Sequence, residues 1–102
     1  MQNEVSTFLK AHDLQLEAEK RYIDLVSEIG ELGKELLLAT NYGARPPEYR
    51  GNMHGELGDC LFSLLALCDE LEIDAEDALA GALEKYKKRA LSKGNIGSDV
   101  SS

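Results

Sequence analysis

The 102-residue sequence has no tryptophan, only two prolines and only two cysteines, and no stretch of it alternates apolar and polar residues as a β-strand does. The missing alternation argues against a fold built on a sheet. Both prolines are adjacent, at Pro46 and Pro47, so the strongest helix breakers are confined to one segment. The sequence therefore predicts an all-α chain.

Positive charge and long apolar runs are also scarce. Lysine and arginine total 11 against 19 acidic residues, and the net charge of −8 argues against a nucleic-acid partner. The longest apolar run, from Cys60 to Cys68, is interrupted by Ser63 and is too short to span a bilayer. The first ten residues have no basic flank followed by an apolar core, so we expect no signal peptide. Cys60 and Cys68 lie about 12 Å apart along one predicted helix, too far for a disulfide, which indicates a reducing, cytoplasmic environment.

What is present is helical periodicity. Apolar residues recur at helical spacing over about residues 19–40, 52–71 and 74–91, and we expect one apolar face of each helix to be buried. Asp74 is the expected N-cap of the last of these helices. A shorter helix is expected in the first 18 residues, with a break near "AHDLQ". Breakers between residues 40 and 52 make a short connection, which favours antiparallel neighbours and a four-helix bundle-like protomer.

The length predicts one domain, which we place at residues 1–92, followed by a flexible tail over 93–102, "KGNIGSDVSS". A chain this short buries only about 60–65% of its unfolded surface, so partner subunits would help to complete its core. The segment "VSTFL", residues 5–9, adds an apolar face that one small bundle does not fully cover. We therefore expect a homo-oligomer, a dimer or a tetramer.

Acidic residues form the clearest polar pattern. Four of them share one face of the 19–40 helix, and two more follow on the next helix: Asp24, Glu28, Glu31, Glu35, Glu56 and Asp59. Like charges at this spacing repel. Antiparallel packing would aim Glu28, Glu31, Glu56 and Asp59 toward a common space, where a divalent cation would relieve the repulsion. One Glu-x-x-Glu pair is usually a solvated surface; the second pair makes a metal site the stronger interpretation.

The ligand type narrows the choice of cation. Carboxylate oxygens are hard ligands, which favour Mg²⁺, Mn²⁺ or Ca²⁺ over zinc and copper. A di-iron bundle would need Glu-x-x-His motifs, and neither acidic pair has a histidine at the fourth position. The glycines beside the acids, Gly30, Gly33, Gly55 and Gly58, each cost about 1 kcal/mol relative to alanine in a helix. They indicate either close helix contact or room for a bulky ligand.

The last predicted helix carries cations. Lys85 and Arg89 lie four residues apart in "EKYKKR" and are suited to bind phosphate oxygens. The alternative is that they only complement the dipole at the helix C-terminus. Tyr86 between them is expected in the core. Acids that hold metal and cations that bind phosphate together favour phosphoryl chemistry.

Three segments carry a family resemblance: "EIGELGKELL", "ELGDCLFSLLAL" and "IDAEDALAGALEKYKKR". Together they are similar to the MazG-type all-α nucleoside triphosphate pyrophosphohydrolases over about residues 22–91. The signature of that family is Glu-x-x-Glu followed by Glu-x-x-Asp, which is found here at Glu28, Glu31, Glu56 and Asp59.

The resemblance implies Mg²⁺ bound by these four carboxylates, with Mn²⁺ as a substitute, and hydrolysis of a nucleoside triphosphate to a monophosphate and pyrophosphate. Glu28 or Glu31 would take the proton of the attacking water, and Lys85 and Arg89 would bind phosphate. It also implies dimers, often paired into tetramers. Ser27, Ser63 and the lack of tryptophan depart from many relatives, and these departures concern base recognition rather than chemistry. The alternatives are a related phosphoribosyl-ATP or dUTP pyrophosphohydrolase, or a non-catalytic helical regulatory or dimerisation module.

Overall fold

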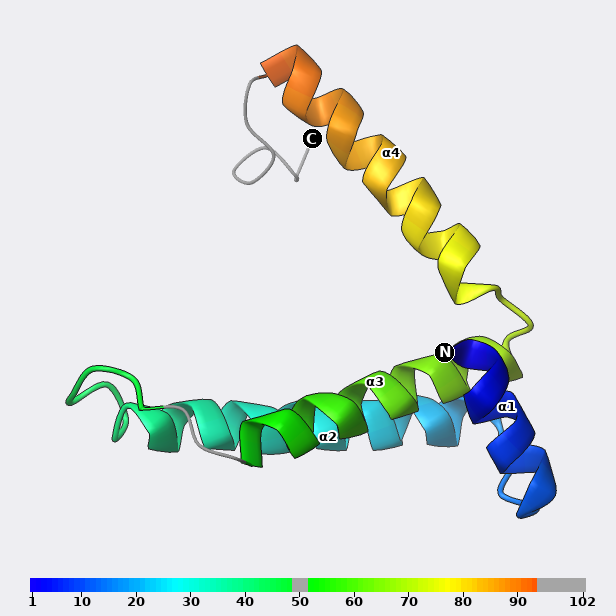
Figure 1. Ribbon diagram of the computed structural model, residues 1–102, viewed down its shortest axis with the longest axis horizontal. Coiled ribbons are helices and arrows are strands. Elements are labelled where there is room, and N and C mark those ends of the chain that lie inside the picture. The colour runs from blue at the N-terminus through cyan, green and yellow to red at the C-terminus, as the bar shows by residue number, and fades with distance from the viewer. Residues whose placement is uncertain (49–51, 94–102) are drawn as a thin grey trace. The chain divides into compact units, whose positions relative to one another are not determined.

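The computed structural model describes residues 1–48 and 52–93. Within them lie four helices and no strand: α1 (Gln2–Ala11), α2 (Ala18–Ala39), α3 (Asn52–Glu70) and α4 (Ala75–Lys93) (Figure 1). The prediction of an all-α chain with four helices is confirmed, and the helix ends lie close to those that the apolar periodicity predicts. The predicted flexible tail falls, after Lys93, outside the described residues, so the domain boundary at residue 92 stays a prediction.

The chain forms two compact units. The first is Met1–Glu72 and contains α1, α2 and α3, and the second begins at Ile73 and contains α4. At the end of the first unit, Glu72 adopts a positive φ of 57°, and its amide donates to the carbonyl of Asp69. This turn ends the run of helical backbone before Asp74 starts the next helix.

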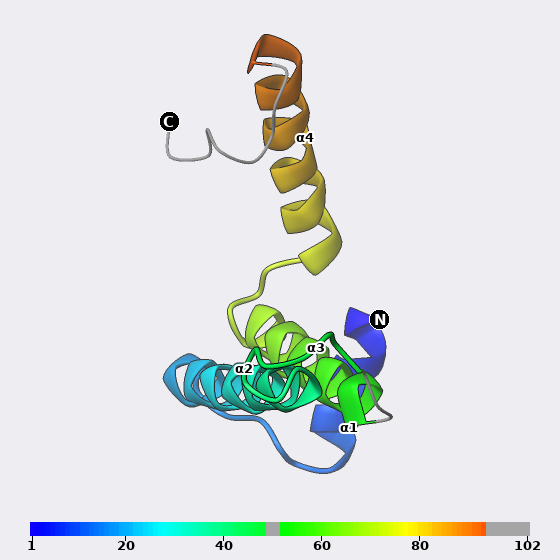
Figure 2. The same cartoon turned by 90° about the vertical axis from the view of Figure 1, so that its left-hand side faces the viewer.

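Helices α2 and α3 lie side by side and run in opposite directions, as both views show (Figures 1 and 2). The connection that leaves α2 is built on Thr40, whose hydroxyl donates to the Leu37 carbonyl (3.3 Å) and accepts from the Gly43 amide (2.9 Å). Gly43 has φ +87°, a conformation that glycine adopts without steric cost. Arg45 then donates to the Leu38 carbonyl (3.2 Å), a backbone acceptor in the last turn of α2. The antiparallel arrangement expected from the short connection is confirmed.

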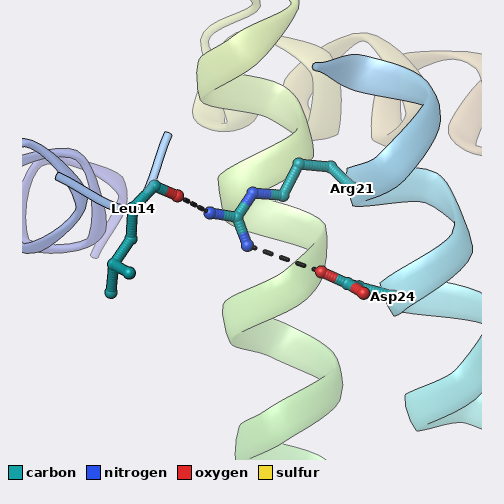
Figure 3. A network of polar contacts seen from close by, with 3 residues as sticks. All are labelled: Leu14, Arg21 and Asp24. Carbon is teal, nitrogen blue, oxygen red and sulfur yellow. Dashed lines mark hydrogen bonds and ion pairs between the residues drawn. The ribbon is translucent and has the colours of Figure 1, made fainter. Parts of the chain in front are cut away.

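Helix α1 packs against α3 through aromatic and apolar side chains. Phe8 meets Phe62 edge to face, with ring centroids 6.0 Å apart, and Leu9 beside it is buried. This geometry is the favourable one for two aromatic quadrupoles. The segment between α1 and α2 is held by Arg21, which is only 6% exposed, donates to the Leu14 carbonyl and pairs with Asp24 at 3.7 Å (Figure 3).

The expectation that the apolar faces are buried is wrong for α2 and α3 in the single chain. Among the described residues the buried apolar set is small: Leu9, Ala39, Leu65 and Ala66. Ile23 on α2 is 64% exposed and Leu57 on α3 is 52% exposed, although both belong to apolar faces. Two helices packed as a pair cover only a strip of each other, and the remaining apolar surface stays in contact with solvent.

Helix α4 begins as the sequence predicts. The Asp74 carboxylate accepts from the amides of Glu76 (2.9 Å) and Asp77 (3.3 Å), which satisfies two donors that the first turn would otherwise leave unpaired. Leu79 and Leu83 on this helix are 57% and 48% exposed.

None of the helices in the described residues is both long and apolar enough to cross a membrane.

Candidate metal centre

The candidate site lies where α2 and α3 face each other. Glu28 comes from α2, and Glu56 and Asp59 come from adjacent turns of α3, three residues apart. Each offers one carboxylate oxygen, and these three oxygens lie within 4.8 Å of one another. Glu28 and Glu56 are partly buried, whereas Asp59 is exposed. The antiparallel packing thus gathers three of the four carboxylates that the sequence predicts to converge.

The electrostatics of Glu56 show the repulsion within this group. Its pKa is raised above the ordinary value of 4.5, first by burial and then by the negative charges of Asp59, Glu31, Glu28 and Glu35. The pKa of the Cys60 thiol is raised as well, by burial and then by the negative charges of Glu28, Glu56 and Asp59. A thiol held in its protonated form is a poor metal ligand. Oxygen is therefore the ligand atom that this site offers.

The other acids of the α2 stripe lie around the three-oxygen group rather than in it. Glu31 is exposed, and its charge acts on Glu56. Glu35, one turn further along α2, lines a cavity of about 290 Å³ with Arg45, Glu48 and Asn52 among its other walls. Asp24 is paired with Arg21 at the opposite end of the stripe. The stripe therefore divides into an ion-paired end, a cluster of carboxylates and a cavity.

The glycines beside the acids do not mediate close helix contact within the described residues. A methyl group added at Gly30, Gly33, Gly55 or Gly58 would meet no atom within 4 Å. Of the two interpretations that the sequence left open, close helix contact does not hold within the single chain, and open space remains. Gly55 lies one turn before Asp59 on α3 and so shares its face, which keeps the space beside that carboxylate open.

These observations fit a divalent cation. Three carboxylates from two helices can be brought this close without a cation only at the cost of mutual repulsion. Burial, and after it this repulsion, raises the pKa of Glu56. Carboxylate oxygens are the ligands that Mg²⁺ and Mn²⁺ prefer, and Mg²⁺ sites commonly use few carboxylates and leave positions to water and phosphate. The donor set and its open side therefore suit such an ion.

The two cations predicted to bind phosphate lie on α4. Lys85 is exposed, Arg89 is partly buried, and both approach the ring of Tyr86. Tyr86 is partly buried rather than in a core. Tyr42 is 68% exposed in the turn after α2, and Tyr49 lies outside the described residues.

Comparison with known protein families identifies the family of this chain. Residues 16–92 match the model of the MazG nucleotide pyrophosphohydrolase domain, which covers most of the chain and both acidic pairs. The chain belongs to the MazG family. Both acidic pairs, on α2 and α3, lie within the matched residues, and the family resemblance inferred from the sequence is confirmed.

A relative of this MazG-family chain is found in Bacillus subtilis (strain 168). The two are 35% identical over 68 residues, and the relative carries the description "Uncharacterized protein YpjD". The matched segment covers 64% of this chain and 60% of YpjD, so the chain spans less than two thirds of that relative. No solved structure gave a significant match.

Proposed function

We propose that this protein hydrolyses a nucleoside triphosphate between its α and β phosphates, releasing a nucleoside monophosphate and pyrophosphate, with Mg²⁺ or Mn²⁺ held by Glu28, Glu31, Glu56 and Asp59. One observation carries the proposal: carboxylate oxygens from two antiparallel helices meet within 4.8 Å in a chain of the MazG family. A bound divalent ion neutralises phosphate charge and makes water a stronger nucleophile at neutral pH.

The residues of the chain have separate tasks in this scheme. Of the four acids, Glu28, Glu56 and Asp59 would supply the closest oxygens to the ion, and Glu31 would complete the acidic group around it. Glu31 is exposed beside them and lies outside the three-oxygen group, so it is the better candidate to accept a proton from water, with Glu28 as the alternative. Lys85 and Arg89 are our candidates for binding phosphate oxygens, where a cation stabilises the charge on the departing pyrophosphate.

The two cysteines bear on the compartment in which the protein works. Cys60 and Cys68 are both free thiols. We infer a reducing compartment, the cytoplasm, and a homodimer or homotetramer as the active form.

The test is a pyrophosphate-release assay with Mg²⁺ and a panel of canonical, deoxy and modified nucleoside triphosphates, together with dUTP and phosphoribosyl-ATP. We expect release from at least one of them, and the preferred substrate separates the related activities. Asp59→Asn and Glu31→Gln should each lower turnover at least about a hundredfold, because each removes a charge that acts only at the site.

The matched controls are Asp69→Asn and Glu70→Gln, which make the same chemical changes on α3 outside the acidic group. Both should keep the wild-type rate. No release from any substrate would favour the non-catalytic helical module instead, and a near-wild-type rate for folded Asp59→Asn would contradict the site assignment.

A further inference from the structure

Two cationic side chains of α4 lie over one aromatic ring. The Nζ atom of Lys85 is 5.4 Å from the centroid of the Tyr86 ring, and the Cζ atom of Arg89 is 5.7 Å from it. A cation within about 6 Å of a ring centroid is attracted by the negative face of the π system. The sequence predicts only a packing role for Tyr86, whereas in the structure its ring contacts two charged side chains.

We propose that Tyr86 positions Lys85 and Arg89 as one binding element for the pyrophosphate portion of the substrate. The inference rests on the proposed function, and it concerns α4 alone. Lysine and arginine side chains have many rotamers, and each must lose that freedom to bind an anion. A ring that already attracts both side chains restricts them before the substrate arrives and offsets the repulsion between their charges.

The chemistry of the two cations suits adjacent phosphoryl groups. Arginine presents a planar fork of donors to two oxygens, and lysine presents a compact charge to a neighbouring oxygen. Tyr86 acts through these two side chains and does not itself contact the phosphate, so it is a positioning residue.

A competing explanation is that the cations of α4 only complement the helix dipole. In that case the position of a cation around the helix would matter little. Lys87 provides the comparison, because it is exposed and lies about 200° around the helix from Lys85. Positioning by the ring predicts different effects for Lys85 and Lys87, and the dipole alone predicts similar ones.

The first experiment measures binding of inorganic pyrophosphate, with Mg²⁺ present, to the full chain by titration calorimetry. Tyr86→Leu should raise Kd about three- to tenfold, and Tyr86→Phe, which keeps the ring face, should stay within about twofold of wild type. In the nucleotide assay, Tyr86→Leu should raise KM by a similar factor while kcat changes by less than about twofold.

A double-mutant cycle separates positioning from general packing. In a background that lacks both cations, Lys85→Met with Arg89→Met, Tyr86→Leu should add less than about twofold to Kd, whereas in a Lys87→Met background it should keep its full effect. Equal effects of Tyr86→Leu in both backgrounds would overturn the proposal, as would wild-type affinity in folded Tyr86→Leu. If Tyr86→Leu fails to fold, Tyr86→Met takes its place in the same cycle.

These experiments distinguish failure of the Tyr86 inference from failure of the proposed hydrolytic function. Hydrolysis without any effect of Tyr86 on pyrophosphate binding or KM overturns only this inference. Pyrophosphate binding that follows the predicted cycle, with no hydrolysis of any nucleotide, overturns the activity and leaves the binding element supported.

Discussion

Glu56 illustrates how the acidic site lowers the stability of the folded protein. Its carboxyl is partly buried and faces Asp59 on its own helix and Glu28 and Glu31 on the neighbouring one, and its pKa is raised for these reasons. A carboxyl whose pKa is higher in the folded than in the unfolded state favours folding while it is protonated. That contribution is present below about pH 4.5 and is lost as the pH rises through the raised folded value. Without metal, the charged site therefore weakens the fold at neutral pH.

We expect Glu56→Gln to show this directly. Glutamine keeps nearly the same shape and does not titrate, so in EDTA the variant should gain in melting temperature relative to wild type as the pH rises from about 4 to about 7. Thermal melting followed by circular dichroism measures the difference, and Glu70→Gln is the control with the same chemical change away from the site. A difference between Glu56→Gln and wild type that does not change with pH would contradict the assignment.

Arg21 has a structural role that the sequence does not predict. It lies two residues after the expected start of a helix near residue 19, in a sequence position typical of an exposed charge. Yet it is 6% exposed and donates to the Leu14 carbonyl. The hydrogen-bond partner is a backbone oxygen in an irregular segment, so no pattern of side chains in the sequence predicts this bond. By contrast, Asp74 was predictable as a cap because its partners are the amides of its own helix.

Arg21→Met should lower the free energy of unfolding by about 1–3 kcal/mol, because it leaves the Leu14 carbonyl without its donor. Asp24→Asn should cost much less, since Asp24 is half exposed and its pair with Arg21 is screened by water. Denaturant unfolding monitored at 222 nm measures both. Comparable losses from the two variants would show that the ion pair, and not the bond to the backbone, holds this segment.

At the scale of helices, the sequence predicts which residues share a face but not how much of that face is covered. The periodicity places Glu28, Glu56 and Asp59 beside the apolar stripes of α2 and α3, and antiparallel packing then brings their oxygens together. The role of the four glycines could not be predicted from the sequence, because glycine is found both where helices pack closely and where space is left for a ligand. Only the coordinates show that the space around them is open.

Gly55→Ala tests whether that space serves the substrate. Alanine should stabilise α3 by up to about 1 kcal/mol, because it lowers the backbone entropy of the unfolded chain. It should also raise KM for the nucleotide several-fold, because the added methyl lies on the face of Asp59. Gly81→Ala on α4 is the matched control and should leave KM unchanged. An unchanged KM in Gly55→Ala would show that the substrate does not use the space beside Asp59.

At the scale of the whole molecule, exposed apolar surface is the dominant feature. Side chains of the first unit such as Ile23, Ile29 and Leu57 are each more than half exposed, and the buried apolar set among the described residues is small. Surfaces of this kind are typical of chains that associate. The sequence predicted association from the short length and from the apolar segment 5–9, and the structure adds which apolar side chains are exposed in the single chain.

We therefore expect a mass of two or four times 11.2 kDa by light scattering at micromolar concentration. Ile23→Glu should lower that mass or the melting temperature, because it places a charge in surface that a second copy would bury. Glu19→Gln, an exposed change on the same helix, is the control. A wild-type mass near 11.2 kDa would contradict the expectation of a homo-oligomer.

The central claim is that the acids of α2 and α3 form a site that repels itself until a divalent cation binds. An ion that binds only the folded state stabilises it by about 2.7 kcal/mol at a concentration a hundred times its dissociation constant. The measurement is thermal melting of wild type, Asp59→Asn and the control Asp69→Asn, each in EDTA and in millimolar Mg²⁺. We predict that Asp59→Asn melts above wild type in EDTA and gains little from Mg²⁺, while wild type and Asp69→Asn gain strongly. No Mg²⁺ shift in wild type, or an Asp59→Asn protein that is less stable in EDTA, would contradict the claim.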